Sequence, residues 1–232
     1  MESPATLPGY LGSTSFSAVL AEHPSELSFE LPANNVAFGP STRVVDPIRL
    51  QSGIDILKLL SEFSICDSLI RKFYSRTLCV VIPAVMIEAI MQSVRGILGG
   101  LDFTGAMDSQ IQDLAHQIFQ NTSRPVAVNA TMTVSDYCAL FTGRNLRWEA
   151  VGIMFATSGI ALMSTPDTDP DIVQVAADSQ AKDRLRAQIV DASSTCLSFC
   201  DQAASVSELL GFCQYNDVML RTQQFGDSSK EE

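Results

Sequence analysis

The chain has 232 residues and carries 15 Lys and Arg against 26 Asp and Glu, a formal net charge of -11. Hydrophobic residues make up 46% of it and charged residues 18%, which excludes a disordered chain, because disorder requires low hydrophobicity and high charge. The acidic balance weighs against direct contact with nucleic acid, since phosphate backbones are bound by clustered Lys and Arg. A chain of this length can bury a sizeable core in one large domain or two small ones.

Neither a secretory signal nor a membrane span is expected. The N-terminus reads Met-Glu-Ser-Pro and has no basic stretch followed by an apolar run. The longest apolar stretch, Ala150 to Met163, is shorter than the roughly 20 apolar residues that a spanning helix needs, so it predicts a buried core helix. We therefore expect a cytosolic or nuclear protein that does not associate with membranes.

The first 47 residues differ in composition from the rest and predict an extended, proline-rich lead. Six of the ten prolines lie in it, at positions 4, 8, 24, 32, 40 and 47. Proline cannot continue a helix interior, so this spacing forbids long helices. We therefore divide the chain into a lead over 1–47, a helical domain over 48–226 and a polar, frayed tail over 227–232.

Beyond Pro47 the apolar residues recur at three- and four-residue steps, which predicts helices. Asp46 is the expected N-cap of the first helix and Pro47 its first residue. Helical segments are expected at about 48–63, 66–73, 83–98, 109–119, 133–141, 146–163, 181–199 and 205–222. The turn formers of 164–171 predict a break, and Cys79 to Ile82 is either a short strand or, as we prefer, an apolar connector. The predicted fold is all-α, a multi-helix scaffold of orthogonal or superhelical type.

No catalytic or cofactor-binding residues are predicted. Histidine is the commonest acid–base residue, and His23 and His116 are interpreted as surface or structural residues. No serine elbow, P-loop or dinucleotide-binding motif occurs, and the glycines at 96, 99, 100 and 105 are interpreted as a helix stop and a loop. An aspartate-rich helical motif is approached only by Asp102, Asp108 and Asp113, which are too spread out. We therefore expect no enzymatic activity and keep a helical biosynthetic enzyme as the least favoured alternative.

The six cysteines are scattered, at positions 66, 79, 138, 196, 200 and 213. Cys196 and Cys200 share one helix face and could bind zinc with Cys213 and His116, but only this pair has the local spacing of zinc ligands. In a reducing compartment, buried core cysteines are the preferred interpretation, because free Cys is among the most buried residue types. No disulfide and no zinc site are predicted.

An acidic loop offers a second set of metal ligands. Its carboxylates alternate as Asp167, Asp169 and Asp171, superficially like the start of a calcium loop. The loop lacks the central glycine and the terminal Glu that such a site requires, so a solvated turn is expected.

The single tryptophan, Trp148, lies within a polar cluster. Arg144, Arg147 and Glu149 flank it, at the start of the long apolar helix. One interpretation is a polar cluster that fixes the start of that helix or contacts a partner. The preferred interpretation is an aromatic anchor packed on the core, with its indole N–H satisfied by a nearby hydrogen bond.

Short landmarks recur along the chain in order. They are Tyr10-Leu-Gly-Ser-Thr-Ser-Phe16, Gln51-Ser-Gly53 with the helix after it, Cys66 to Tyr74, Phe141 to Phe155, Ser194 to Cys200, Asn216 to Leu220 and Gly226-Asp-Ser-Ser229. The most specific is Phe141 to Phe155, which contains Asn-Leu-Arg-Trp-Glu at the head of an apolar helix. Together they resemble the middle homology region of fungal transcription factors of the binuclear zinc cluster class.

This resemblance implies a regulatory or interaction module of transcription, located in the nucleus or alternatively in the cytoplasm, with protein partners or self-association. The family's head is a basic six-cysteine cluster that holds two zinc ions, and nothing like it precedes Tyr10, so neither DNA binding nor zinc is expected of this chain. The family's helical region also continues past the segment that resembles 226–229. We therefore expect an incomplete regulatory domain whose uncovered apolar faces favour self-association.

A small-molecule-sensing helical module is the alternative function. Regulators of this kind sense metabolites in an apolar cavity, and ordinary core packing would explain the same residues equally well. The lining residues would be Met86, Met91, Met154, Phe155 and Met163.

Overall fold

The computed structural model describes residues 45–60, 63–77, 80–101, 107–129, 131–175, 179–200 and 207–226. The chain divides into two units, residues 1–43 and 44–232, and all the described residues belong to the second. The predicted lead therefore lies outside the described residues except for its last three, and so do the tail over 227–232, His23 and the Tyr10 landmark. Within the described residues every regular element is a helix, which confirms the all-α class.

The helices follow the predicted segments closely. In chain order they are α2 (Pro47–Leu59), α3 (Phe63–Arg76), α4 (Ala84–Gly99), α5 (Met107–Thr122), α6 (Val134–Ala139), the 3-10 helix η2 (Gly143–Asn145), α7 (Trp148–Ser164), α8 (Pro170–Val175), α9 (Ser179–Cys200) and α10 (Glu208–Phe225). The segment predicted over 48–63 ends at Leu59, and α3 begins at Phe63. Helix α8 begins inside the predicted break, with Pro170 as its first residue, a position that suits proline's fixed φ.

Side-chain caps explain where several helices begin. Asp46 caps α2 as predicted, accepting a hydrogen bond from Ile48 N. Thr133 and Asp136 form a capping box at the start of α6, and Ser207 accepts from Leu210 N at the start of α10. Each cap satisfies backbone N–H groups that the first turn of a helix leaves without partners.

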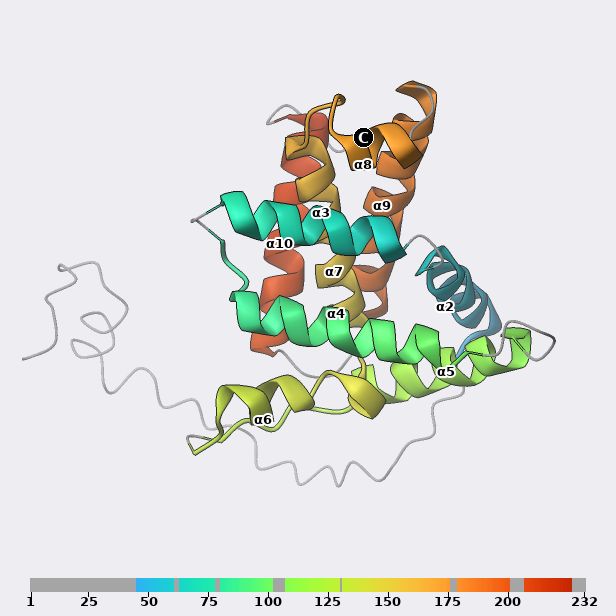
Figure 1. Ribbon diagram of the computed structural model, residues 1–232. Helices are drawn as coiled ribbons and strands as arrows, with labels where there is room; N and C mark the ends of the chain where they lie inside the picture. The colour runs from blue at the N-terminus through green and yellow to red at the C-terminus, as the bar shows by residue number, and fades with distance from the viewer. Residues whose placement is uncertain are drawn as a thin grey trace, which may run out of the picture. The chain divides into compact units, whose positions relative to one another are not determined.

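Helix α7 is the centre of the helical unit. Every residue of it from Trp148 to Leu162 is buried, which confirms the predicted core helix. Helices α9 and α10 pack along α7, while α3 and α4 cross it, and α2 packs on α5. Figure 1 shows the two directions: α7, α9 and α10 run roughly side by side, and α3 and α4 lie across them. Each helix therefore buries a face against α7 or one of its neighbours.

Glycines on α7 let its neighbours approach closely. A Cβ on Gly152 would lie 2.9 Å from Cys213 Sγ of α10 and 3.1 Å from Cys196 Cβ of α9. A Cβ on Gly159 would lie 2.6 Å from Leu220 Cδ1 of α10. Real Cβ contacts are longer than this, so α10 can lie at its observed distance from α7 only where α7 has glycine.

The exposure of Ile48 differs from the expected helical pattern, and the connector over 79–82 is only partly tested. Ile48, the first of the apolar residues that recur beyond Pro47, is 76% exposed, because it lies in the first turn of α2, before the turns that are buried. Of the connector over 79–82, the described residues 80–82 form no strand, while Cys79 lies outside the described residues. In the described part of the chain, no helix has the length and hydropathy to cross a membrane.

Candidate functional site

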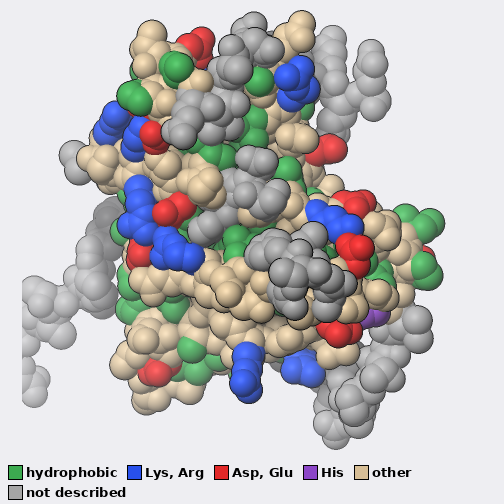
Figure 2. Space-filling model, turned by 45° about the vertical axis from the view of Figure 1, so that its right-hand side comes forward, with side chains coloured by type: hydrophobic (Ala, Val, Ile, Leu, Met, Phe, Trp, Pro, Cys, Tyr) green, Lys and Arg blue, Asp and Glu red, His purple; other side chains and the backbone are tan. Residues whose placement is uncertain are grey.

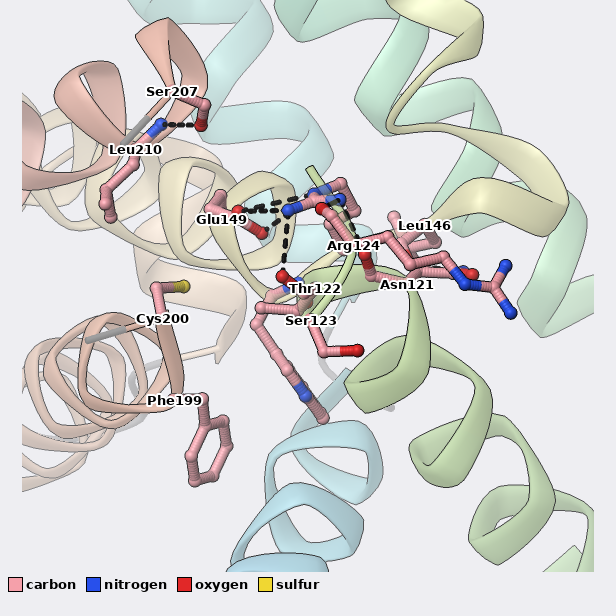
Figure 3. A network of polar contacts seen from close by, with 12 residues as sticks. Asn121, Thr122, Ser123, Arg124, Leu146, Glu149, Phe199, Cys200, Ser207 and Leu210 are labelled. Carbon is pink, nitrogen blue, oxygen red and sulfur yellow. Dashed lines mark hydrogen bonds and ion pairs between the residues drawn. The ribbon is translucent and has the colours of Figure 1, made fainter. Parts of the chain in front are cut away.

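A buried polar network joins the end of α5 to the start of α7 (Figure 3). The Arg147 guanidinium donates to the backbone carbonyls of Asn121 (2.5 Å), Arg124 (2.8 Å) and Thr122 (3.0 Å). It also pairs with the Glu149 carboxylate, with Nη2 2.8 Å from Oε1, and both side chains are buried. Carbonyls at a helix C-terminus lack donors within the helix, so Arg147 caps α5 and holds α7 against it.

The same junction is tied from the α5 side. Asn121 Nδ2 donates to the carbonyls of Arg144 and Leu146, both at 2.9 Å, and Trp148 N donates to Thr122 Oγ1 at 2.9 Å. Each helix end thus satisfies backbone groups of the other. Of the polar cluster flagged in the sequence, Arg147 and Glu149 fix the start of α7, whereas Arg144 is exposed.

The Trp148 ring is fully buried and forms an aromatic cluster. Its centroid lies 5.1 Å from that of Phe119 and 5.0 Å from that of Phe199, and a Cβ on Gly53 would lie 2.9 Å from the ring. The predicted aromatic anchor is therefore confirmed. The predicted hydrogen bond is wrong: among the described residues, Trp148 Nε1 has no partner, and its aromatic neighbours Phe119 and Phe199 offer no acceptor.

The three cysteines considered as zinc ligands lie in the core around α7. Cys196, Cys200 and Cys213 are fully buried, and Cys200 donates its S–H to the Cys196 carbonyl. Burial raises the pKa of the Cys196 and Cys200 thiols well above the usual value, which favours the protonated form over the thiolate that binds metals. His116 lies on α5 and is half-buried. Within the described ranges, no group of three His, Cys, Asp or Glu side chains is arranged to hold a metal ion.

The acidic loop is held by lysines. Lys72 Nζ of α3 lies 2.5 Å from Asp169 Oδ1 and 2.8 Å from Asp171 Oδ2, and Lys182 of α9 pairs with Asp167. Ser68 donates a further hydrogen bond to Asp171. The hydrogen bonds from Lys72 lower the pKa of both Asp169 and Asp171. These residues thus form an ion-paired segment at the start of α8 that packs on α3, and Asp169 is buried, contrary to the solvated turn expected.

Most basic side chains in the described residues are paired with carboxylates. The paired residues are Lys58, Arg71, Lys72, Arg76, Arg95, Arg147, Lys182, Arg186 and Arg221. The face shown in Figure 2 accordingly has Lys and Arg in small separate groups, several of them beside Asp or Glu. This arrangement presents no continuous basic surface on that face.

The aspartates and glycines considered as catalytic or phosphate-binding residues do not form a site in the described part of the chain. Asp108 is exposed and pairs with Lys58 at 2.9 Å, Asp113 is exposed on α5, and Asp102 and Gly105 lie outside the described residues. Gly96 and Gly99 belong to α4, and Gly100 is its C-cap, as the predicted helix stop requires.

The methionines proposed as a cavity lining belong to the packed core. Met86, Met91, Met154 and Phe155 are buried in the main cluster, and Met163 is partly buried beside α10. A shallow groove of about 370 Å³ lies elsewhere, between α4, α5 and η2. Its sides include Ser93, Ile97, Leu114, Gln117 and Arg144.

Sequence reasoning missed the outer face of α10, defined here as Tyr215, Val218, Met219 and Phe225. Their exposed fractions are 47%, 59%, 36% and 58%, although all four are large and apolar. Helix α10 therefore has two apolar faces, one packed on α7 and α9 and one open. The signal was available as a second set of three- and four-residue steps beside the buried set.

Comparison of the chain with models of protein families, with curated proteins and with solved structures gives no match. The likeness to zinc cluster transcription factors therefore stays a prediction from the landmarks in the sequence.

Proposed function

We propose that this chain is the regulatory and interaction module of a fungal transcription regulator related to the binuclear zinc cluster class, acting in the nucleus without binding DNA itself. The observation that carries the proposal is the outer face of α10. Large apolar side chains gathered on one exposed helix face are typical of a site of protein–protein contact.

The packing of the landmarks supports the family relationship. Gly53, Trp148 and Phe199 come from three landmarks that lie far apart in the sequence, and they meet in one aromatic cluster. The landmark of 141–155 contains Arg147 and Glu149, which join α5 to α7. These landmark residues thus contribute to the core and to the helix junction, as expected of a pattern that marks a family.

The charge distribution supports a role without direct DNA contact. The net charge is -11, and the ion pairs of α3 and α4 neutralise the basic side chains that phosphates would need. We expect no sequence-specific shift of DNA by the purified chain in a gel-shift assay at moderate salt. A tight, sequence-specific complex would contradict this part of the proposal.

The function can be tested by tethering. The full 232-residue chain is fused to an unrelated DNA-binding domain in a yeast reporter strain, and reporter transcription is compared with that from the DNA-binding domain alone. We expect a several-fold change, in either direction, because a regulatory module recruits or masks other proteins. Equal transcription, with the fusion present in the nucleus at equal level, would contradict the proposal.

A second candidate is a small-molecule-sensing module, favoured by the groove between α4, α5 and η2. Its volume of about 370 Å³ falls in the range of ligand sites, roughly 300–1,000 Å³. Ile97 and Leu114 provide apolar surface, and Arg144 is exposed and pairs with no carboxylate of the described residues, so an amphipathic carboxylate fits this chemistry.

Thermal-shift assays with a panel of aliphatic and aromatic monocarboxylates test this candidate. A ligand should raise the melting temperature by mass action. Gly96→Leu would fill the groove, because Gly96 lines it and its Cβ position is open, whereas Gly99→Leu is a matched control outside the lining. Loss of the shift in both variants, or in neither, would rule out this groove.

A further inference from the structure

Helix α2 covers the aromatic cluster of the core from the edge of the helical unit. It packs on α5 and α9, and Figure 1 shows it beside α5. Of its 13 residues, Gly53, Ile56 and Leu57 are buried, whereas α7 is buried over most of its length. Helices in proteins are stabilised mainly by the apolar face that they bury, so α2 is held more weakly than the central helix.

The contact of α2 with the aromatic cluster depends on the absence of a side chain at Gly53. A Cβ built there would lie 2.9 Å from Phe119 Cε2 and 2.9 Å from Trp148 Cζ2. Real Cβ contacts are longer, so only glycine lets α2 lie this close to the two rings. Glycine in a helix interior also lowers helix stability relative to alanine. The residue that permits the contact therefore weakens the helix that makes it.

Arg49 ties α2 to the far side of the cluster. Its Nη2 donates to the Phe199 carbonyl at 3.0 Å, and its guanidinium carbon lies 5.4 Å from the Phe119 ring centroid and 5.6 Å from that of Phe199. Phe199 lies in the last turn of α9 (Figure 3), where carbonyls lack donors within the helix. Arg49 thus gives α2 a hydrogen bond and two cation–π contacts. The ion pair of Lys58 with Asp108 is exposed, and such pairs add little stability.

The closed position of α2 has a cost at Trp148. The indole is fully buried, and its Nε1 has no hydrogen-bond partner among the described residues. A buried donor without a partner has lost its hydrogen bond to water, which disfavours the conformation that buries it. In an indole ring, Cζ2 is two bonds from Nε1, so Gly53 contacts the edge of the ring that carries the N–H. Movement of α2 away from this edge would let water reach the donor.

We propose that α2 is a conformational switch, which opens as a unit while the helices around α7 stay folded and closes over the rings of Phe119, Trp148 and Phe199. Closed, α2 makes an autoinhibitory contact, because it occupies the aromatic surface. Open, this surface offers three rings, the Trp148 N–H as donor and the Phe199 carbonyl as acceptor, which suits an apolar ligand with a polar group. The inference is independent of the proposed function, since the outer face of α10 plays no part in it.

Acrylamide quenching of fluorescence tests the switch, because Trp148 is the only tryptophan of the chain. The full chain is titrated with urea, and quenching is compared with far-UV circular dichroism, which follows global unfolding. We expect quenching to increase at urea concentrations below the main loss of helix, because α2 opens before the core unfolds. Quenching that increases only together with the loss of helix would overturn the proposal.

Two substitutions that weaken the contacts of α2 should act without urea. We expect Gly53→Ala and Arg49→Met each to increase the quenching of Trp148 several-fold. The matched controls are Gly96→Ala, whose Cβ position is open, and Arg71→Met, which removes an ion pair between α3 and α4. Both controls should quench like the unmodified chain, and equal quenching in all four variants would contradict the proposal. If circular dichroism shows that Gly53→Ala does not fold, Arg49→Met and its control decide the test.

The dye anilinonaphthalene sulfonate, which fluoresces on apolar surfaces, tests what the opening uncovers. We expect dye fluorescence to increase several-fold with Gly53→Ala and Arg49→Met and to stay unchanged with the two controls. Increased quenching without dye binding would show that acrylamide reaches the indole while α2 stays in place, and would overturn the switch. Loss of the proposed function in the tethering assay, with the expected quenching and dye binding, would leave the switch intact.

Discussion

At the scale of single residues, Arg147 shows how much of one helix junction depends on one side chain. It satisfies three carbonyls at the end of α5 and pairs with Glu149 at the start of α7. A buried ion pair has a high desolvation cost, and its removal as a unit is far less harmful than the loss of one partner. The pair therefore serves to fix the position of α7 more than to add net stability.

We expect Arg147→Met to lower the free energy of unfolding by about 3–5 kcal/mol, because it leaves the Glu149 carboxylate buried and unpaired. The double variant with Glu149→Leu should recover part of this loss, although the three carbonyls remain without their donor. Urea denaturation of both single variants and the double variant measures the coupling. A loss below about 1 kcal/mol for Arg147→Met would show that the pair is not buried as described.

Sequence patterns predicted these residues only in part. The cluster of Arg144, Arg147 and Glu149 around Trp148 was visible, and so was the burial of Trp148, because a large aromatic at the head of an apolar helix has few alternatives. The sequence did not show that Arg147 and Glu149 would be buried at the junction while Arg144 is exposed. That difference depends on where the end of α5 lies, 23 or more residues earlier in the chain. The unpartnered Trp148 Nε1 is likewise a property of its neighbours Phe119 and Phe199.

At the scale of the helices, capping residues and turn formers were the features that best predicted where helices begin. Asp46, Pro83 and Thr133 mark helix starts correctly, because capping is local chemistry. Helix α8 was missed, because the proline and aspartates that predict a break also begin a helix. The outer face of α10 was missed, because one helix can satisfy two periodic patterns and only the buried one was considered.

The glycines of the helices give a paired prediction. Gly159→Ala should destabilise the protein by about 1–3 kcal/mol, because the added Cβ would lie 2.6 Å from Leu220 Cδ1. Gly96→Ala should stabilise it by about 0.5–1 kcal/mol, since its Cβ position is open and alanine favours the helix. Thermal unfolding of both variants tests this, and a shift of the same sign in both would contradict the close packing of α10 on α7.

The ion pairs between α3 and the start of α8 predict a pH dependence. The pKa values of Asp169 and Asp171 are lowered from 3.8 in the folded protein, chiefly by hydrogen bonds from Lys72. Their contribution to stability is therefore complete above pH 3.8 and is lost as the pH falls through the lower folded-state values. The pKa of Lys72 is raised from 10.5, so its contribution is complete below that pH and is lost as the pH rises through the folded-state value.

Lys72→Met should accordingly lower the melting temperature between about pH 5 and 9, and the difference from the unmodified chain should shrink below pH 4. Melting curves recorded over this range measure the effect. A difference that stays constant down to pH 2 would show that Lys72 acts through its packing and not through its charge.

At the scale of the whole molecule, two features define the account. The core around α7 is closed, with its cysteines, methionines and tryptophan used in packing. The outer face of α10 is apolar and open. Four of the ten large apolar side chains that are exposed among the described residues lie on this one helix. A chain with a packed core and such a face is suited to binding other proteins, and this is the central claim.

The most direct measurement of this claim is reporter transcription from the tethered full chain and its Val218→Asp and Val128→Asp variants, at equal nuclear levels. We expect Val218→Asp to abolish most of the effect on transcription, because it places a charge on the outer face of α10, whereas Val128→Asp should leave the effect unchanged. Equal activity of all three chains, or loss with Val128→Asp alone, would contradict the assignment of the interaction to α10.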